Sequence, residues 1–324
     1  MASREQFQGV YVVVPTPLHD DERIDHAGLT HLVNFYIESG CHGLLVLGSG
    51  GEFPYFTFEE RVQVVKTAAR AAKGRVPVLA GAGFCGQREA LAFTREASVK
   101  GMDGFLVIMP TYHPVNIDDA VSYYAGIASS SKKPVLYYHY PQMTGLFYSP
   151  VELAHILTLP GIAGMKESSL SLGEMKAHLA LMKGKDFALF AGNSFSLLKT
   201  LEMGGCGAIC QIPSFAPGLA SGCYEAWKSG DAERASRLQQ KILDLLPFLN
   251  TFDMAPGVQK LAYRLISRAP FSLRNKNRSR HAVIKETLRQ MGHPVTARVR
   301  NPLPQISGSG REAISAMISA HRPL

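Results

Sequence analysis

Residues 134–141 read PVLYYHYP and residues 161–168 read GIAGMKES, two short apolar runs that each end in reactive side chains. Apolar character sustained over roughly four to eight residues is typical of a strand covered on both faces, as in a parallel sheet. Similar runs recur along the first part of the chain, each followed by an amphipathic helical pattern. The other runs lie at 9–17, 43–49, 76–83, 104–110, 187–193 and 207–213.

This alternation of strands and helices predicts a (β/α)8 TIM barrel, because evenly spaced parallel strands joined by helices close most naturally on themselves. The helical pattern at 57–73 opens with Thr57 three residues before Glu60, which is a capping-box spacing. A doubly wound open sheet is the alternative, but the chain has no long crossover and no dinucleotide-binding fingerprint. Several expected helices end at a glycine before the next strand, at Gly40, Gly74, Gly101 and Gly204.

The pattern changes near Ala216, after which only helices are expected. We therefore predict a barrel over 1–228, a C-terminal helical extension over 229–300, and a tail over 301–324 that ends in a helix at 311–320. Within this C-terminal part, helical patterns occupy 216–228, 231–250, 257–267 and 280–291.

The composition of the chain argues against a membrane protein and against a nucleic-acid-binding protein. The chain has 324 residues, is 46% hydrophobic, and contains neither a membrane-length apolar run nor a signal-peptide core, so a cytoplasmic protein without membrane contact is expected. The net charge of +8 arises from residues 251–324, and its densest stretch, RNKNRSR (274–280), has no interleaved aromatic residues. That distribution favours a solvated or subunit-contact surface over nucleic-acid binding.

The five cysteines lie mostly in apolar stretches and predict reduced, buried thiols. Cys206 and Cys210 have a spacing that could suggest metal ligands, but no matching Cys or His cluster follows them. We therefore expect neither a metal ion nor a cofactor.

Lys166 is the most unusual residue of the predicted barrel interior. Active sites of such barrels lie at the C-terminal ends of the strands, which is where the run at 161–168 places this lysine. A buried ammonium is unfavourable, so the side chain tends to lose its proton and become a nucleophile that forms Schiff bases with ketones. The alternatives are a lysine that reaches solvent or one that pairs with Glu167.

Two further strand ends carry groups that could assist a Schiff-base lysine. Tyr138 lies on the opposite strand face from Tyr137 and His139, and its hydroxyl could relay protons, although simple core packing is an alternative. The loop GSGGE (48–52) could hold an anion on Ser49 and backbone amides, although a tight turn in which Glu52 caps the next helix is also open. Together with Lys166, these features describe a site for a 2-oxo acid.

With these residues in place, the chain resembles the dihydrodipicolinate synthase and N-acetylneuraminate lyase family of class I Schiff-base aldolases, over roughly residues 7 to 295. The resemblance implies Lys166 as the Schiff-base lysine, Tyr138 as the proton relay, and Tyr112 as a second relay tyrosine that crosses a dimer interface. It also implies that Ser49 and the Gly50 amide hold the pyruvate carboxylate, with Ser168, Gly192 and Ile209 completing the substrate-binding positions. The motifs that carry the resemblance are GSGGE (48–52), YHYPQMTG (138–145), GMKES (164–168) and GGCGAI (204–209).

Departures from the family pattern bear on the substrate. Met143 stands where synthases of the family carry an arginine for the aldehyde's carboxylate, and residues 192–195 lack the carboxylate that sialate lyases use. The loop is more similar to those of keto-deoxy sugar acid and 4-hydroxy-2-oxoglutarate aldolases. Gly50 replaces a hydroxyl residue, which weakens the implied relay through Tyr112.

These observations predict an aldolase or lyase whose partners are pyruvate or another 2-oxo acid and an aldehyde, assembled as a homotetramer built from two dimers. A dehydratase or deaminase that uses the same Schiff base remains open. A non-catalytic 2-oxo acid sensor is disfavoured by the retention of Lys166 and Tyr138, and dihydrodipicolinate synthesis proper is disfavoured by Met143.

Overall fold

The computed structural model describes residues 4–83, 86–109, 113–249 and 279–321. Eight parallel strands pair in sequence order, and β1 also pairs with β8, so the sheet closes into a barrel. The predicted (β/α)8 barrel is thereby confirmed, and the open sheet is excluded. The strands are β1 Gly9–Val13, β2 Gly43–Val46, β3 Val78–Gly81, β4 Gly104–Ile108, β5 Val135–His139, β6 Ile162–Glu167, β7 Ala188–Ala191 and β8 Gly207–Cys210.

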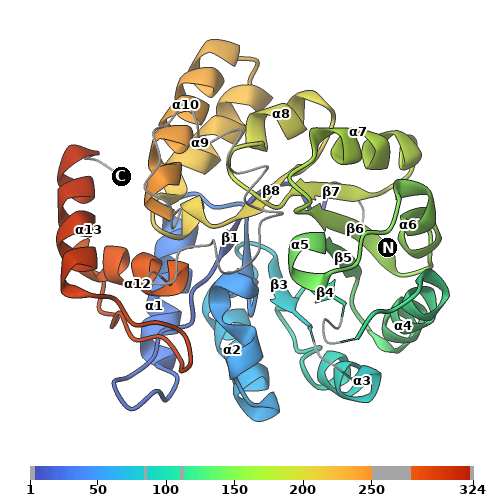
Figure 1. Cartoon of the computed structure of the whole chain (residues 1–324), viewed down its shortest axis with the longest axis horizontal. Helices are drawn as coiled ribbons and strands as arrows, with labels where there is room; N and C mark the ends of the chain where they lie inside the picture. Colours follow the sequence, from blue (N-terminus) through green and yellow to red (C-terminus); the bar gives the residue numbers. More distant parts are fainter. Residues whose placement is uncertain (1–3, 84–85, 110–112, 250–278, 322–324) are drawn as a thin grey trace.

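Helices surround the barrel, as Figure 1 shows. The capping box before α2 is confirmed, since the Glu60 amide donates to Thr57 Oγ1 over 3.2 Å and the Thr57 amide donates to the Glu60 carboxylate over 2.8 Å. The four glycines expected at helix ends all adopt positive φ. The helices of the ring are α1 His26–Glu38, α2 Phe58–Ala72, α3 Gln87–Glu96, α4 Ile117–Ser130, α6 Pro150–Leu157, α7 Leu172–Leu181, α8 Leu197–Glu202 and α9 Pro217–Lys228, with a short α5 Pro141–Thr144 after β5.

Two apolar cores form, one inside the barrel and one between the strands and the helices. Tyr138 belongs to the inner core with Phe190 and Ile209, whereas Tyr137 packs in the outer core. The predicted alternation along β5 is therefore confirmed, and it brings Tyr138 into the barrel interior.

The barrel closes where two glycines meet. Gly207 has φ +151°, and a Cβ built on it would lie 1.8 Å from the carbonyl oxygen of Gly9 on β1. A side chain there would force β1 and β8 apart, so the seam depends on a residue without a Cβ.

The C-terminal part is helical where it is described, with α10 Ala232–Leu249, α12 Arg280–Gln290 and α13 Gly308–Ala320. The expected helix at 257–267 and most of the basic stretch at 274–280 lie outside the described residues. The terminal helix begins three residues earlier than expected. In Figure 1, α12 lies beside α1. The ring of His293, which follows α12, packs against Phe35 of α1 with ring centroids 4.1 Å apart and ring planes tilted by 51°. None of the described helices has the length and apolar character that crossing a membrane requires.

Candidate active site

Lys166 and Tyr138 face each other across neighbouring strands inside the barrel. They are register partners of β6 and β5. The Lys166 Nζ atom lies 4.3 Å from the centroid of the Tyr138 ring, and the two residues are only 4% and 6% exposed. The structure therefore brings together the two residues that the sequence singled out, and it excludes a lysine that reaches solvent.

Burial makes Lys166 a nucleophile near neutral pH. Loss of hydration lowers the pKa of Lys166 to about 8, and the neighbouring Cys210 thiol opposes this shift. Glu167 does not neutralise Lys166, because its carboxylate pairs with His178, with 2.9 Å between Oε2 and Nδ1. No ion pair to Lys166 is found among the residues that the structure describes.

Tyr138 is suited to donate a proton. Burial raises the pKa of Tyr138 to about 12, and the nearby hydroxyls of Ser49 and Ser168 act in the opposite direction. The phenol is therefore neutral at physiological pH and lies among hydroxyl groups that can pass protons onward. Tyr140 stacks on it, with ring centroids 5.5 Å apart.

The loop after β2 forms a tight turn at the barrel mouth, with a 3₁₀ helix η1 at Ser49–Gly51. A Cβ on Gly50 would lie 2.9 Å from Val13 Cγ1, so a side chain here would have to displace the Val13 side chain. The sequence leaves capping by Glu52 open. Glu52 occupies the N-cap position of the 3₁₀ helix η2 Phe53–Tyr55, but its side chain makes no capping bond, and Thr57 is the N-cap of α2. The Glu52 side chain is instead fully buried and forms a 2.5 Å ion pair with Lys285.

Ser168 and Gly192 lie against each other at the ends of β6 and β7. The Gly192 amide donates to the Glu167 carbonyl over 2.6 Å, and a Cβ on Gly192 would fall 1.7 Å from Ser168 Oγ. Ile209 is fully buried in the inner core, so its side chain packs inside the barrel. Tyr112 lies outside the described residues.

Residues that the sequence did not single out also border the site. The Gln211 side chain, just after β8, approaches Gly50, with Nε2 3.1 Å from the place of a Gly50 Cβ. His281 Nε2 lies 2.7 Å from the Ser49 carbonyl oxygen. His281 lies in the helix expected at 280–291, directly after the basic stretch 274–280, and nothing in the sequence there indicated this contact.

A buried polar cluster lies on the reverse face of β5 and β6. His139 Nε2 is 3.3 Å from a carboxylate oxygen of Glu174, and Glu167 accepts from the Ser169 amide as well as facing His178. Donor atoms of His139, Glu167 and Glu174 lie within 4.8 Å of one another, a set that a metal ion could use. Each carboxylate lies within ion-pair distance of a histidine, but Glu167 Oε2 and both ring nitrogens of His178 make no hydrogen bond to the described residues.

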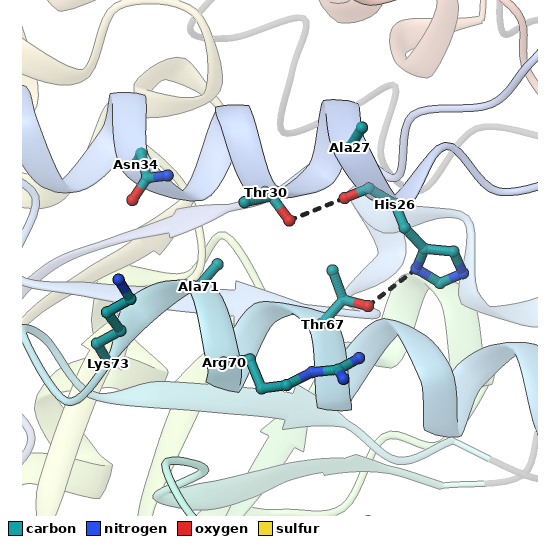
Figure 2. Close-up of a pocket in the computed structure, with 8 residues that line it drawn as sticks. All are labelled: His26, Ala27, Thr30, Asn34, Thr67, Arg70, Ala71 and Lys73. Carbon is teal, nitrogen blue, oxygen red and sulfur yellow. Dashed lines mark hydrogen bonds between the residues drawn. The ribbon is translucent and has the colours of Figure 1, made fainter.

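A pocket of about 420 Å³ lies apart from these residues, between α1 and α2. Figure 2 shows His26 directed at Thr67, with 2.9 Å between Nδ1 and Oγ1, and the basic side chains of Arg70, further along α2, and of Lys73, directly after the helix. None of the predicted site residues lines this pocket.

Comparison with known proteins agrees with this geometry. The Dihydrodipicolinate synthetase family matches residues 6–275. A probable 2-dehydro-3-deoxy-D-pentonate aldolase of Escherichia coli K12 is 30% identical over 98% of both chains. A 4-hydroxy-tetrahydrodipicolinate synthase of Methanospirillum hungatei is 34% identical over 83% of this chain and 92% of its own.

Solved structures of the same family are also similar to this chain. A prophage protein of the dihydrodipicolinic acid synthase family from Escherichia coli K12, solved with pyruvate, matches 97% of this chain and 98% of its own with a TM-score of 0.83 and 28% identity. A monomeric dihydrodipicolinate synthase variant matches 97% of this chain and 96% of its own with a TM-score of 0.80 and 25% identity. The chain belongs to the dihydrodipicolinate synthetase family and is an enzyme of its Schiff-base-forming lyase type.

The buried lysine predicts a pH-dependent stability difference. Its pKa falls from 10.5 to about 8 on folding, so below pH 8 the folded protein holds a buried charge, a penalty of about 3 kcal/mol. As pH rises from about 8 towards 10.5, the folded state loses this proton before the unfolded state does, and the penalty disappears. We therefore expect Lys166→Met to raise the free energy of unfolding by about 2 to 3 kcal/mol at pH 7, and by much less at pH 9.5.

Urea unfolding at the two pH values measures this difference. Lys176→Met, which removes an exposed lysine of α7, is the matched control and should show no comparable change. A Lys166→Met protein that is less stable than the wild type at pH 7 would contradict the assignment of Lys166 as an uncompensated buried charge.

Proposed function

We propose that this protein is a pyruvate-dependent class I aldolase that cleaves or forms 2-oxo (keto-deoxy) acids through a Schiff base on Lys166. The observation that carries the proposal is the contact of Lys166 Nζ with the Tyr138 ring in a buried site with two serine hydroxyls. A lysine whose pKa is lowered to about 8 supplies a larger neutral fraction near pH 7 than an ordinary lysine, and with a neutral phenol beside it this is the combination that imine formation requires.

In the first half-reaction, neutral Lys166 Nζ attacks the C2 carbonyl of the 2-oxo acid and forms a carbinolamine. Tyr138 donates a proton to the departing hydroxyl, which leaves as water and gives the protonated Schiff base. The substrate carboxylate is held by Ser49 and the Gly50 amide at the barrel mouth, in line with the close turn of η1.

In the second half-reaction, the C3–C4 bond breaks and its electrons pass into the Schiff base to give an enamine. The C4 hydroxyl loses its proton to the Tyr138 oxygen, and the aldehyde departs. The enamine takes this proton at C3 from the Tyr138 hydroxyl, which regenerates the protonated Schiff base. Water then adds to the Schiff base and gives a proton back to the Tyr138 oxygen, and collapse of the carbinolamine releases pyruvate and free lysine. Condensation is the same sequence in reverse.

Two positions at which the chain departs from the family pattern narrow the substrate class. Met143 is 53% exposed and offers no charge for a second carboxylate. Residues 192–195 supply amide and hydroxyl groups, which suit a hydroxylated aldehyde fragment. The 30% identity to a probable 2-dehydro-3-deoxy-D-pentonate aldolase supports a keto-deoxy sugar acid over an amino-aldehyde.

Borohydride reduction in the presence of pyruvate tests the mechanism. We expect a covalent adduct on Lys166, located by peptide mass spectrometry, and release of pyruvate from 2-keto-3-deoxy acids in a coupled assay. Tyr138→Phe should lower turnover by roughly 10² to 10⁴-fold while leaving pyruvate binding largely intact. Modification of a different lysine refutes the assignment, and a 2-oxo acid product that retains all its carbons identifies a dehydratase or deaminase instead.

Met143 predicts poor dihydrodipicolinate synthase activity. A carboxylate-binding arginine contributes a charge-assisted hydrogen bond of about 1.5 to 3 kcal/mol, which this position lacks. Turnover of pyruvate with aspartate semialdehyde should therefore be low, and Met143→Arg should raise kcat/KM for that aldehyde by roughly tenfold or more. Efficient turnover by the unmodified protein would show that another basic residue supplies the contact.

We further propose a homotetramer built from two dimers, in which the loop containing Tyr112 lies at the dimer contact. Phe147 and Val151 are 72% and 69% exposed, an unusual state for large apolar side chains. Tyr148, between them, donates to the Val115 carbonyl over 2.5 Å and so connects this apolar surface with the chain that follows Tyr112. A monomeric relative exists, so the fold alone does not decide the assembly.

Assembly is tested by sedimentation with parallel activity measurements. Phe147→Asp combined with Val151→Lys should dissociate the oligomer and lower activity, because a dissociated subunit loses the partner's tyrosine. Leu181→Lys, on a 37% exposed position of α7, is the control and should change neither property. A fully active monomer would remove Tyr112 from the site.

A further inference from the structure

The loop that follows β2 is fixed at both ends by residues from the C-terminal part of the chain. At its end, Glu52 is fully buried with φ +61°, a backbone conformation that residues other than glycine rarely adopt. Its carboxylate pairs with Lys285 of α12, with 2.5 Å between Oε1 and Nζ, and accepts the Arg300 amide over 2.8 Å at Oε2. Lys285 is itself 1% exposed and also donates to the Arg298 carbonyl over 2.7 Å.

The start of the loop is held by His281, at the first turn of α12. Its Nε2 lies 2.7 Å from the Ser49 carbonyl oxygen, 232 positions away in the chain. Because a carbonyl oxygen can only accept, Nε2 must carry the hydrogen. Nδ1 faces Ser279 Oγ at 3.3 Å, and that oxygen also caps the helix by accepting the Ala282 amide. His281 is therefore oriented on both sides.

These contacts contribute little to the stability of the packing of α12 against the barrel. A buried ion pair gives little net stability, because desolvating the two charges offsets their attraction. A hydrophobic pair would join α12 to the barrel as well, but it would leave the direction of the loop open. The Glu52–Lys285 pair and the His281 hydrogen bond instead specify where the backbone of Ser49 and Glu52 lies.

We propose that His281, Lys285 and Glu52 form a positioning clamp that holds the loop 48–52 in the geometry needed to bind the substrate carboxylate. The clamp rests on the proposed function, in which Ser49 and the Gly50 amide bind that carboxylate. His281 contacts the loop backbone and acts through Ser49, so it is a positioning residue. The C-terminal segment from 279 to 300 is thereby part of the catalytic apparatus and more than a covering of the barrel.

The clamp predicts a loss that is specific to carboxylate-bearing substrates. We compare borohydride trapping of Lys166 by pyruvate with trapping by acetone, a ketone that has a methyl group in place of the carboxylate. His281→Leu should raise the half-saturating concentration of pyruvate by tenfold or more, while trapping by acetone stays within about twofold, because misplacement of one binding group weakens only the contacts it makes. His281→Gln, which can still donate to the Ser49 carbonyl, should recover most of the pyruvate affinity.

Arg289→Gln is the matched control, since Arg289 lies on the same helix and pairs with Glu286. It should leave both trapping reactions unchanged. If His281→Leu does not fold, the double variant Glu52→Gln, Lys285→Met removes both buried charges together and should show the same selective loss. Unchanged pyruvate affinity in the folded variant, or equal losses with pyruvate and acetone, overturns the clamp.

Hydrogen exchange separates this proposal from the proposed function. If wild-type Lys166 is not trapped by pyruvate, the proposed function fails, and the clamp is then judged by exchange at the amides of residues 48–52. Faster exchange in His281→Leu than in Arg289→Gln supports the clamp, and equal exchange in the two variants overturns it.

Discussion

The rest of the site depends on one constraint, the burial of the Lys166 ammonium at the end of β6 with no carboxylate beside it among the described residues. The barrel interior around it is apolar apart from the hydroxyls near Tyr138, so the charged form is penalised and the pKa falls to about 8. The same desolvation that weakens the fold makes the amine a nucleophile. The burial of Lys166 lowers the free energy of unfolding and raises the reactivity of the amine, a combination that is common at functional sites.

Strand alternation keeps two polar environments apart. On β5 and β6, Tyr138 and Lys166 face the barrel interior, while their sequence neighbours His139 and Glu167 face α7 and pair there with Glu174 and His178. Had Glu167 shared the inner face, its charge would have raised the pKa of the lysine and removed the nucleophile. The period of two along a strand therefore decides the reactivity of Lys166.

The loop 48–52, which we propose binds the substrate carboxylate, has a different requirement. Its glycines give a backbone that can approach a ligand closely but that loses much conformational freedom when it is ordered. Contacts with residues outside the loop restrict its backbone conformation. Lys285 and His281 reach it from α12, and Arg300 extends the network to Glu60 on α2 with a 2.8 Å ion pair. The C-terminal segment thus connects the mouth of the barrel to its outer helices.

The sequence by itself determined the eight strands, the helix cap at Thr57, the face on which Tyr138 lies and the burial of Lys166 at a strand end, because these follow from local periodicity and from the chemistry of single residues. Only the tertiary structure decided that Glu52 pairs with Lys285 and that His281 holds Ser49. In the sequence, Lys285 is one cation within a basic C-terminal region, and Glu52 is one acid before a helix. Their pairing depends on how the chain after the barrel folds back across it. Residues that are more than 200 positions apart share no local sequence pattern from which their contact could be predicted.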